Sequence, residues 1–187
     1  MLFMDDYTRM VWCYFMKSKT EMLQAFVEFK ASTEKHSGNK ILHFRYGNGR
    51  AEYDNTPFLG MLKQSGISYE PSAPYTQNQN GVSERMNRMI MERARTMLLE
   101  AHLRGSLWAE AVNMVVYLHK KSPTRSLEEK TPYEAWNDIK PDLLHLRVFR
   151  YDAYLDVPDE QRTKLKAKSR RYIHVGYSND TTKIWRL

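Results

Sequence analysis

The chain has 187 residues, which is enough for one medium domain or for one domain and a small module. Its 29 Lys and Arg residues outnumber its 22 Asp and Glu residues, and the net charge of +7 favours a polyanionic partner such as nucleic acid. The single cysteine, Cys13, excludes an intramolecular disulfide and a multi-cysteine zinc site, and no apolar run approaches the roughly 18 residues that span a bilayer.

Predicted strands and helices alternate over the first 80 residues. Aromatic and β-branched residues after the turn sequence Asp5-Asp6-Tyr7-Thr8-Arg9 predict a β-hairpin. Ser18 and Glu21 have the spacing of a capping box that opens a helix, and Gly38 is typical of a helix end. The expected elements are a hairpin over 1–16, a helix over 18–36, a strand over 40–45, a helix over 55–66, a strand over 67–70 and a loop over 71–80.

The character of the sequence changes near residue 140. Before this point, apolar residues at helical spacing predict a long helix over 81–103 and a second helix over 107–121. After it, residues 148–157 and 172–177 are predicted to be strands, with no helix between them. The alternation before residue 140 is typical of an α/β layer architecture. We therefore place a domain boundary at Lys140-Pro141-Asp142.

Glu84 is the first candidate site residue. It is predicted to lie one turn into the long helix and away from its apolar stripe, on a polar face with Asn87, Arg88 and Arg95. An acid in a first helical turn commonly does no more than complement the helix dipole. The alternative is a functional site, because the amide-rich stretch over 71–80 leads into a helix face that carries a carboxylate and several cations.

A basic run in the last quarter of the chain is the second candidate. Its six cations, with no acid among them, are Arg162, Lys164, Lys166, Lys168, Arg170 and Arg171. If the run is extended, the five cations that alternate with other residues project from one side and could follow a phosphate backbone. The alternative is a solvated loop in which only Leu165 anchors to the surrounding module. Tyr75 likewise either stacks on a base or packs within its own loop.

Nine short motifs follow one another along nearly the whole chain. They are Asp5-Asp6-Tyr7-Thr8-Arg9, Arg45-Tyr46-Gly47-Asn48-Gly49, Ser72-Ala73-Pro74-Tyr75-Thr76, Gln79-Asn80-Gly81-Val82-Ser83-Glu84-Arg85, Trp108-Ala109-Glu110-Ala111, Ser122-Pro123-Thr124, Thr131-Pro132-Tyr133-Glu134-Ala135-Trp136, His145-Leu146-Arg147-Val148-Phe149 and Val175-Gly176-Tyr177. In this order they resemble the integrases of Copia-type retrotransposons. The resemblance implies an α/β fold: a ribonuclease-H-like mixed sheet with flanking helices over 1–125, a connector over 126–142 and an incomplete SH3-like β-module over 143–187.

The resemblance also implies Mg²⁺-dependent joining of DNA strands at an Asp, Asp, Glu site. Two Mg²⁺ ions roughly 4 Å apart activate a hydroxyl or water and stabilise the leaving oxygen in such chemistry. By position, Glu84 is the third carboxylate, whereas Gly47 replaces the second and offers Mg²⁺ no oxygen ligand. Asp5 and Asp6 fall in the turn after the family's second strand, so we interpret them as turn residues. The first strand and its aspartate are then missing, and the strand over 40–45 is expected to lack its usual neighbour.

We therefore expect a catalytically dead relative of these integrases, in which Glu84 is a residual ligand and Mg²⁺ is not bound productively. The expected partners are DNA, meaning element ends and target DNA, and further copies of the chain. Asn80 and Tyr75 are expected to contact nucleic acid together with the cations named above. We expect an intracellular, nuclear protein with neither a membrane partner nor a small-molecule substrate. The alternatives are an active enzyme, a protein-interaction module and a functionless pseudogene product.

Overall fold

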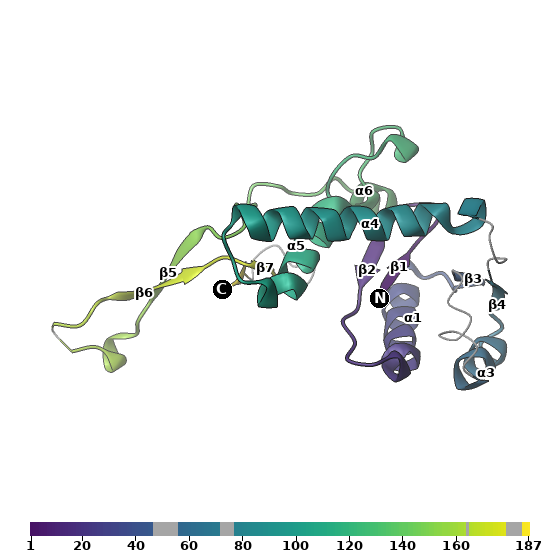
Figure 1. Cartoon of the computed structure of the whole chain (residues 1–187), viewed down its shortest axis with the longest axis horizontal. Helices are drawn as coiled ribbons and strands as arrows, with labels where there is room; N and C mark the ends of the chain where they lie inside the picture. Colours follow the sequence, from purple (N-terminus) through teal and green to yellow (C-terminus); the bar gives the residue numbers. More distant parts are fainter. Residues whose placement is uncertain (47–55, 72–76, 164, 179–184) are drawn as a thin grey trace. The chain divides into compact units, whose positions relative to one another are not determined.

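Short strands and longer helices follow one another in the computed structural model of the chain (Figure 1), which describes residues 1–46, 56–71, 77–163, 165–178 and 185–187. The chain divides into two units. The first comprises Met1–Asp6 and Val11–Met89, and the second comprises Tyr7–Met10 and Ile90–Leu187. Among the described helices, none combines the length and the apolar character needed to cross a membrane.

Over its described residues, the first unit contains two pairs of strands and the complete helices α1 and α3. Its elements are β1 (Leu2–Met4), β2 (Val11–Cys13), a 3-10 turn (Lys19–Glu21), α1 (Met22–Ser37), β3 (His43–Tyr46), α3 (Thr56–Gln64), β4 (Ser68–Pro71) and the first part of α4 (Gln77–Glu100). β1 and β2 pair antiparallel with Phe3 opposite Trp12, which confirms the predicted hairpin. β3 and β4 pair parallel with Phe44 opposite Tyr69.

Helix α1 ends as the sequence predicts but begins differently. Gly38 adopts a φ of 70°, and its N–H donates to the carbonyl of Glu34, as expected for a left-handed helix end. The capping box is wrong, because the Glu21 carboxylate accepts the backbone N–H of Lys17 at 3.2 Å. The Ser18 hydroxyl lies 2.6 Å from the hydroxyl of Thr20 instead. A 3-10 turn at Lys19–Glu21 therefore precedes the helix.

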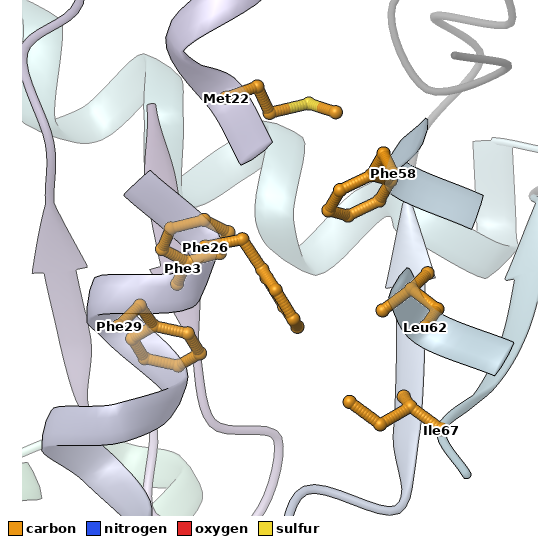
Figure 2. Packing of buried hydrophobic residues seen from close by; sticks show 7 residues of the cluster. All are labelled: Phe3, Met22, Phe26, Phe29, Phe58, Leu62 and Ile67. Atoms are coloured by element: carbon orange, nitrogen blue, oxygen red, sulfur yellow. The ribbon is translucent and has the colours of Figure 1, made fainter. Parts of the chain in front are cut away.

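An aromatic cluster forms the core of the first unit (Figure 2). Phe26 of α1 is fully buried, and its ring makes edge-on contacts with Phe3 of β1, Phe44 of β3 and Phe58 of α3 at centroid distances of 5.7, 5.0 and 5.3 Å. Such T-shaped pairs stabilise beyond the burial of apolar area. The buried members of the cluster are Phe3, Met22, Phe26, Phe29, Phe58, Leu62 and Ile67.

Side chains from both strand pairs pack in this core, but no described hydrogen-bond ladder joins one pair to the other. Over the described residues, β1 pairs with β2 and β3 pairs with β4, and the two ladders remain separate. The first unit is therefore held together by side-chain packing on α1 rather than by one continuous sheet.

The second unit joins helices to short strands. Its elements are the last part of α4, a 3-10 turn (Gly105–Leu107), α5 (Trp108–Lys120), a 3-10 turn (Arg125–Leu127), α6 (Pro132–Asn137), β5 (Asp152–Asp156), a 3-10 turn (Asp159–Gln161), β6 (Ser169–Ile173), β7 (Gly176–Tyr177) and β8 (Trp185–Arg186). β5 pairs antiparallel with β6, and β7 pairs antiparallel with β8. We call the β5–β6 pair the ribbon.

Both predicted strands of the SH3-like region have other bounds than expected: the first is shorter, and the second begins earlier, at Ser169. Residues 148–151 do not join β5, because Arg150 adopts a φ of 69° that a strand cannot accommodate. The second predicted strand, 172–177, is interrupted at His174 and Val175, just before Gly176 with its φ of 148°. Helix α6 was not predicted, although Thr131 and Pro132 form a recognisable start: the Thr131 hydroxyl accepts the N–H of Glu134 at 3.0 Å.

Rings from α5 and from the chain after it pack together in the second unit. Tyr117 of α5 stacks on Tyr177 of β7 with centroids 4.5 Å apart, and its hydroxyl lies 2.6 Å from Nε2 of His145. The fully buried ring of His174 meets Tyr177 edge-on at 4.8 Å. An ion pair of 3.0 Å between Glu110 of α5 and Arg186 of β8 lies in the same unit. These contacts fix β7 and β8 against α5.

We predict that Phe26→Ala will lower the free energy of unfolding by about 3–5 kcal/mol, the usual loss for a buried phenylalanine, because it removes a ring that contacts three elements. Val27→Ala on the same helix is the matched control, since Val27 is 46% exposed. Its expected loss is below about 0.5 kcal/mol. Urea unfolding followed by circular dichroism measures both values, and equal losses would contradict the role given to Phe26.

A second prediction concerns pH and three histidines of the second unit. Burial lowers the pKa of His119, His145 and His174 below 6.5, with further lowering by Arg93 for His119 and by Lys121 for His145. The unfolded chain therefore binds more protons than the folded chain when the pH falls below 6.5. We expect stability to be fully retained above pH 6.5 and to decline as the pH falls toward 5.

Unfolding midpoints measured at pH 7, 6 and 5 test this expectation. A midpoint that does not move between pH 7 and 5 would show that these imidazoles do not titrate as their burial requires.

Candidate nucleic-acid interface

Glu84 lies on the exposed side of α4, about two turns after the helix begins at Gln77. The loop predicted over 71–80 is wrong for Gln77–Asn80, which are helical. These four polar residues carry no apolar period, so the pattern could not reveal them as helix. Because the dipole effect falls off within the first turn, the helix dipole does not account for an acid at this depth.

Asn87, Arg88 and Arg95 are also exposed on α4. Ile90 and Ala94 are the buried residues of this part of the helix, at 0% and 3% exposed. Arg88 and Arg95 are about two turns apart, so their side chains leave the helix in nearly the same direction. Neither arginine takes part in the ion pairs that join residues of the described ranges.

Four of the predicted site residues have no described side chain. Gly47, Tyr75 and Lys164 lie outside the described residues. Asn80 belongs to α4 by its backbone, but its side chain is likewise outside the described set. Their assigned roles remain predictions.

The basic run is not one extended segment. Of the described cations of the run, only Arg170 and Arg171 lie on a strand, β6, where consecutive residues point to opposite faces. The N–H of Val157 donates to the carbonyl of Lys168 at 2.9 Å, which closes the loop between the two strands of the ribbon. The extended arrangement with five cations on one side is therefore wrong. In the alternative interpretation, Leu165 anchors the loop to the surrounding module. This anchor is wrong too, because the Leu165 side chain is 99% exposed.

Acids neutralise two cations of the run. Arg171 donates two hydrogen bonds of 2.9 Å and one of 3.0 Å to the carboxylate of Asp152 across the ribbon, and these bonds raise the pKa of its guanidinium. Arg171 faces Tyr154 in the register, so Asp152 is its diagonal neighbour on the same face. Arg162 forms an ion pair with Asp159.

Lys166, Lys168 and Arg170 are the exposed cations of the run that take no part in the described ion pairs. Arg170 lies opposite Leu155, which is 53% exposed, on the face that does not carry Arg171. Tyr154 on the other face is 67% exposed. Sequence reasoning missed both apolar side chains, although they belong to the predicted strand over 148–157.

A metal centre is not assembled in the described part of the chain, where no group of three or more His, Cys, Asp or Glu side chains could hold a metal ion. Two-metal chemistry requires several carboxylates around one place. Of the predicted ligand positions, Glu84 carries a carboxylate and Gly47 does not. The carboxylates of the described residues therefore do not form a two-Mg²⁺ site.

Comparison with known proteins relates both parts of the chain to one family. Residues 151–187 match the family described as the retroviral polymerase SH3-like domain. The chain is 40% identical over 178 residues to the retrovirus-related Pol polyprotein from transposon TNT 1-94 of Nicotiana tabacum, a match that covers 95% of this chain and 13% of the relative. It is 33% identical to that from transposon RE1 of Arabidopsis thaliana, covering 95% of this chain and 12% of the relative.

The chain is homologous to the Pol polyproteins of plant Copia-type retrotransposons. It spans only about an eighth of the length of these Pol polyproteins. The predicted resemblance is thereby confirmed.

Solved structures confirm the predicted fold of this Pol region. The catalytic core of HTLV-2 integrase in complex with magnesium superposes with a TM-score of 0.54 at 18% identity, covering 72% of this chain and 82% of the core. A simian T-cell lymphotropic virus intasome in complex with PP2A regulatory subunit B56 gamma gives 0.59 at 14% identity, covering 92% of this chain and 60% of that chain. The fold is that of a ribonuclease-H-like integrase core followed by an SH3-like domain.

Proposed function

We propose that this Pol region binds nucleic acid and does not itself catalyse metal-dependent strand transfer. The observation that carries the proposal is the shortage of metal ligands. Gly47 stands where the family has a carboxylate, and the described residues form no cluster of acids with Glu84. Mg²⁺ requires hard oxygen ligands, which one exposed glutamate does not supply in sufficient number.

Exposed cations support the proposed binding of nucleic acid. Arg88 and Arg95 extend from one side of α4, and Lys166, Lys168 and Arg170 extend from the ribbon and its loop. A net charge of +7 adds a long-range attraction for polyanions. Contacts of this kind are made to phosphates, which carry no sequence information, so the binding that we propose tolerates many DNA sequences.

The partner we propose is DNA in the nucleus, either an element end or a target duplex. Two observations on relatives support this: one solved neighbour is an intasome, and the HTLV-2 core is described in dimeric and trimeric forms. We extend this to the chain as a proposal that it self-associates when it binds DNA. The magnesium reported for the HTLV-2 core is a property of that protein.

A protein-interaction module is the second candidate, and a specific feature favours it. Leu144 is 89% exposed and Val148 is 76% exposed, and both lie before the ribbon in the second unit. Large apolar side chains gathered at a surface mark protein contacts in many proteins. The salt dependence of DNA binding separates the two candidates, because apolar contacts do not release counterions.

We predict that the purified chain will give no joined or end-processed products from a labelled duplex with transposon-like ends in Mg²⁺ or Mn²⁺. The reason is the missing carboxylate at Gly47. HTLV-2 integrase on its own ends is the positive control for the assay. Metal-dependent products that the Glu84→Gln variant no longer gives would overturn the proposal that the chain does not catalyse strand transfer.

We also predict steeply salt-dependent binding to unrelated duplexes, with the affinity falling by about 0.9 log units per log unit of salt for each phosphate engaged. Replacing Lys166, Lys168 and Arg170 together by Gln should weaken binding and reduce the slope by about 0.9 for each phosphate that is no longer neutralised. Fluorescence anisotropy between 50 and 200 mM salt measures both quantities.

Arg171→Gln is the matched control for this triple variant. It removes a cation from the same ribbon, but one that Asp152 already neutralises, so the slope should change little. Affinity that ignores salt, or a triple variant that binds like the unchanged chain, would favour the protein-interaction candidate.

A further inference from the structure

Ser169 lies at the loop end of the ribbon, where β6 begins. It stands opposite Asp156, the last residue of β5, and just beyond this pair the N–H of Val157 donates to the carbonyl of Lys168 at 2.9 Å. Figure 1 shows the two strands side by side. The end of a two-stranded ladder opens more easily than its middle. The backbone around Ser169 is therefore accessible to a partner that requires an extended segment.

Cations flank Ser169 on both sides of the sequence. Lys166 and Lys168 precede it, Arg170 and Arg171 follow it, and no acid stands among them. Lys166, Lys168 and Arg170 are exposed, and they take no part in the described ion pairs. The Ser169 side chain is half-buried, and its hydroxyl enters no hydrogen bond within the described residues. A hydroxyl among cations suits a protein kinase whose substrate groove is acidic, because complementary charge selects the substrate.

Thr163 also lies between two cations in the sequence and is the competing acceptor. Two contacts disfavour it. The cation before it, Arg162, forms an ion pair with Asp159. The carbonyl of Thr163 accepts the N–H of Lys166 at 3.0 Å, which holds the residue in a turn. The structure therefore favours Ser169.

We propose that Ser169 is a phosphorylation site for a protein kinase that selects basic residues, and that the phosphate releases the ribbon from nucleic acid. The Ser169 hydroxyl oxygen attacks the γ-phosphorus of ATP, the bond from that phosphorus to the β–γ bridging oxygen breaks, and ADP leaves. The hydroxyl proton passes to a carboxylate of the kinase. The release rests on the proposed function, whereas the modification itself does not.

The charge of a phosphoserine explains the release. A phosphate monoester carries about −1.5 to −2 at pH 7. Lys166, Lys168 and Arg170 are the cations that the ribbon and its loop offer to DNA, so one phosphate cancels most of their charge. The modification therefore acts on the same cations that bind DNA.

The acids of β5 decide where this phosphate turns. Asp156 lies directly opposite Ser169, and like charges in opposite positions repel each other. Arg171 shares the face of Ser169, but the carboxylate of Asp152 already accepts its three hydrogen bonds. Lys166 and Lys168 remain as the available partners of the phosphate in the loop.

The first experiment measures the modification without nucleic acid. The purified chain is incubated with Mg²⁺, radiolabelled ATP and the catalytic domain of protein kinase C, and the labelled residue is identified by mass spectrometry. We expect close to one phosphate per chain at Ser169 and the loss of most label in Ser169→Ala. Thr163→Ala is the matched control and should be labelled like the unchanged chain. Absence of label, or label that persists in Ser169→Ala, overturns the proposal.

The second experiment compares the two forms of the chain on a labelled duplex by fluorescence anisotropy. Loss of two phosphate contacts should reduce the salt slope by about 1.8 and weaken binding at about 100 mM salt by about tenfold or more. Phosphatase treatment should restore the affinity, which excludes a folding defect, and unphosphorylated Ser169→Ala should bind like the unchanged chain. Equal affinity of the two forms overturns the release. A chain that is phosphorylated at Ser169 but binds DNA in neither form contradicts the proposed function and the release, and it leaves the modification site supported.

Discussion

The packing of Phe26 against three separate elements is the interaction on which the first unit depends. A two-stranded ladder is marginally stable in water, and the described residues of the unit form two such ladders that are not hydrogen-bonded to each other. Phe26 touches Phe3, Phe44 and Phe58, so one α1 side chain connects both ladders and α3. The buried aromatic rings therefore hold the two ladders together, as hydrogen bonds do between the strands of a continuous sheet.

The second unit relies on a different arrangement, in which polar rings are buried among aromatic ones. Tyr117 and Tyr177 stack, His145 contacts both of these rings, and His174 contacts Tyr177. Burying imidazoles costs little while they are neutral and much more once they are charged. The ribbon extends from this part with exposed side chains on both faces, which suits a binding surface better than a core.

The sequence predicted those parts of the fold that have strong local signals. The hairpin, the end of α1 at Gly38 and the positions of α4 and α5 all follow from turn residues and apolar periodicity. The start of α4 at Gln77 has no apolar periodicity, although Thr76 and Gln79 have the spacing of a capping box. Helix α6 also has a local signal, in Thr131, Pro132 and Glu134, and it was overlooked.

The candidate site was less predictable, because its chemistry depends on contacts across the ribbon. A count of cations in the basic run gives six, but Arg171 and Arg162 are neutralised by Asp152 and Asp159, which precede the run in the sequence. The register of β5 and β6 decides which acid meets which base, and a positive φ at Arg150 shortens the first strand. None of these features can be deduced from spacing alone.

Amide hydrogen exchange in the free chain tests most directly the claim that aromatic packing, and not a continuous sheet, holds the first unit together. We expect slow exchange at the ladder amides of Phe3, Trp12 and Phe44. We expect fast exchange at the amides of Leu2, Met4 and His43, which point away from β2 and β4, in the same sample. Equal protection of all six amides would contradict the claim, because it would show that these three amides are also hydrogen-bonded within a sheet.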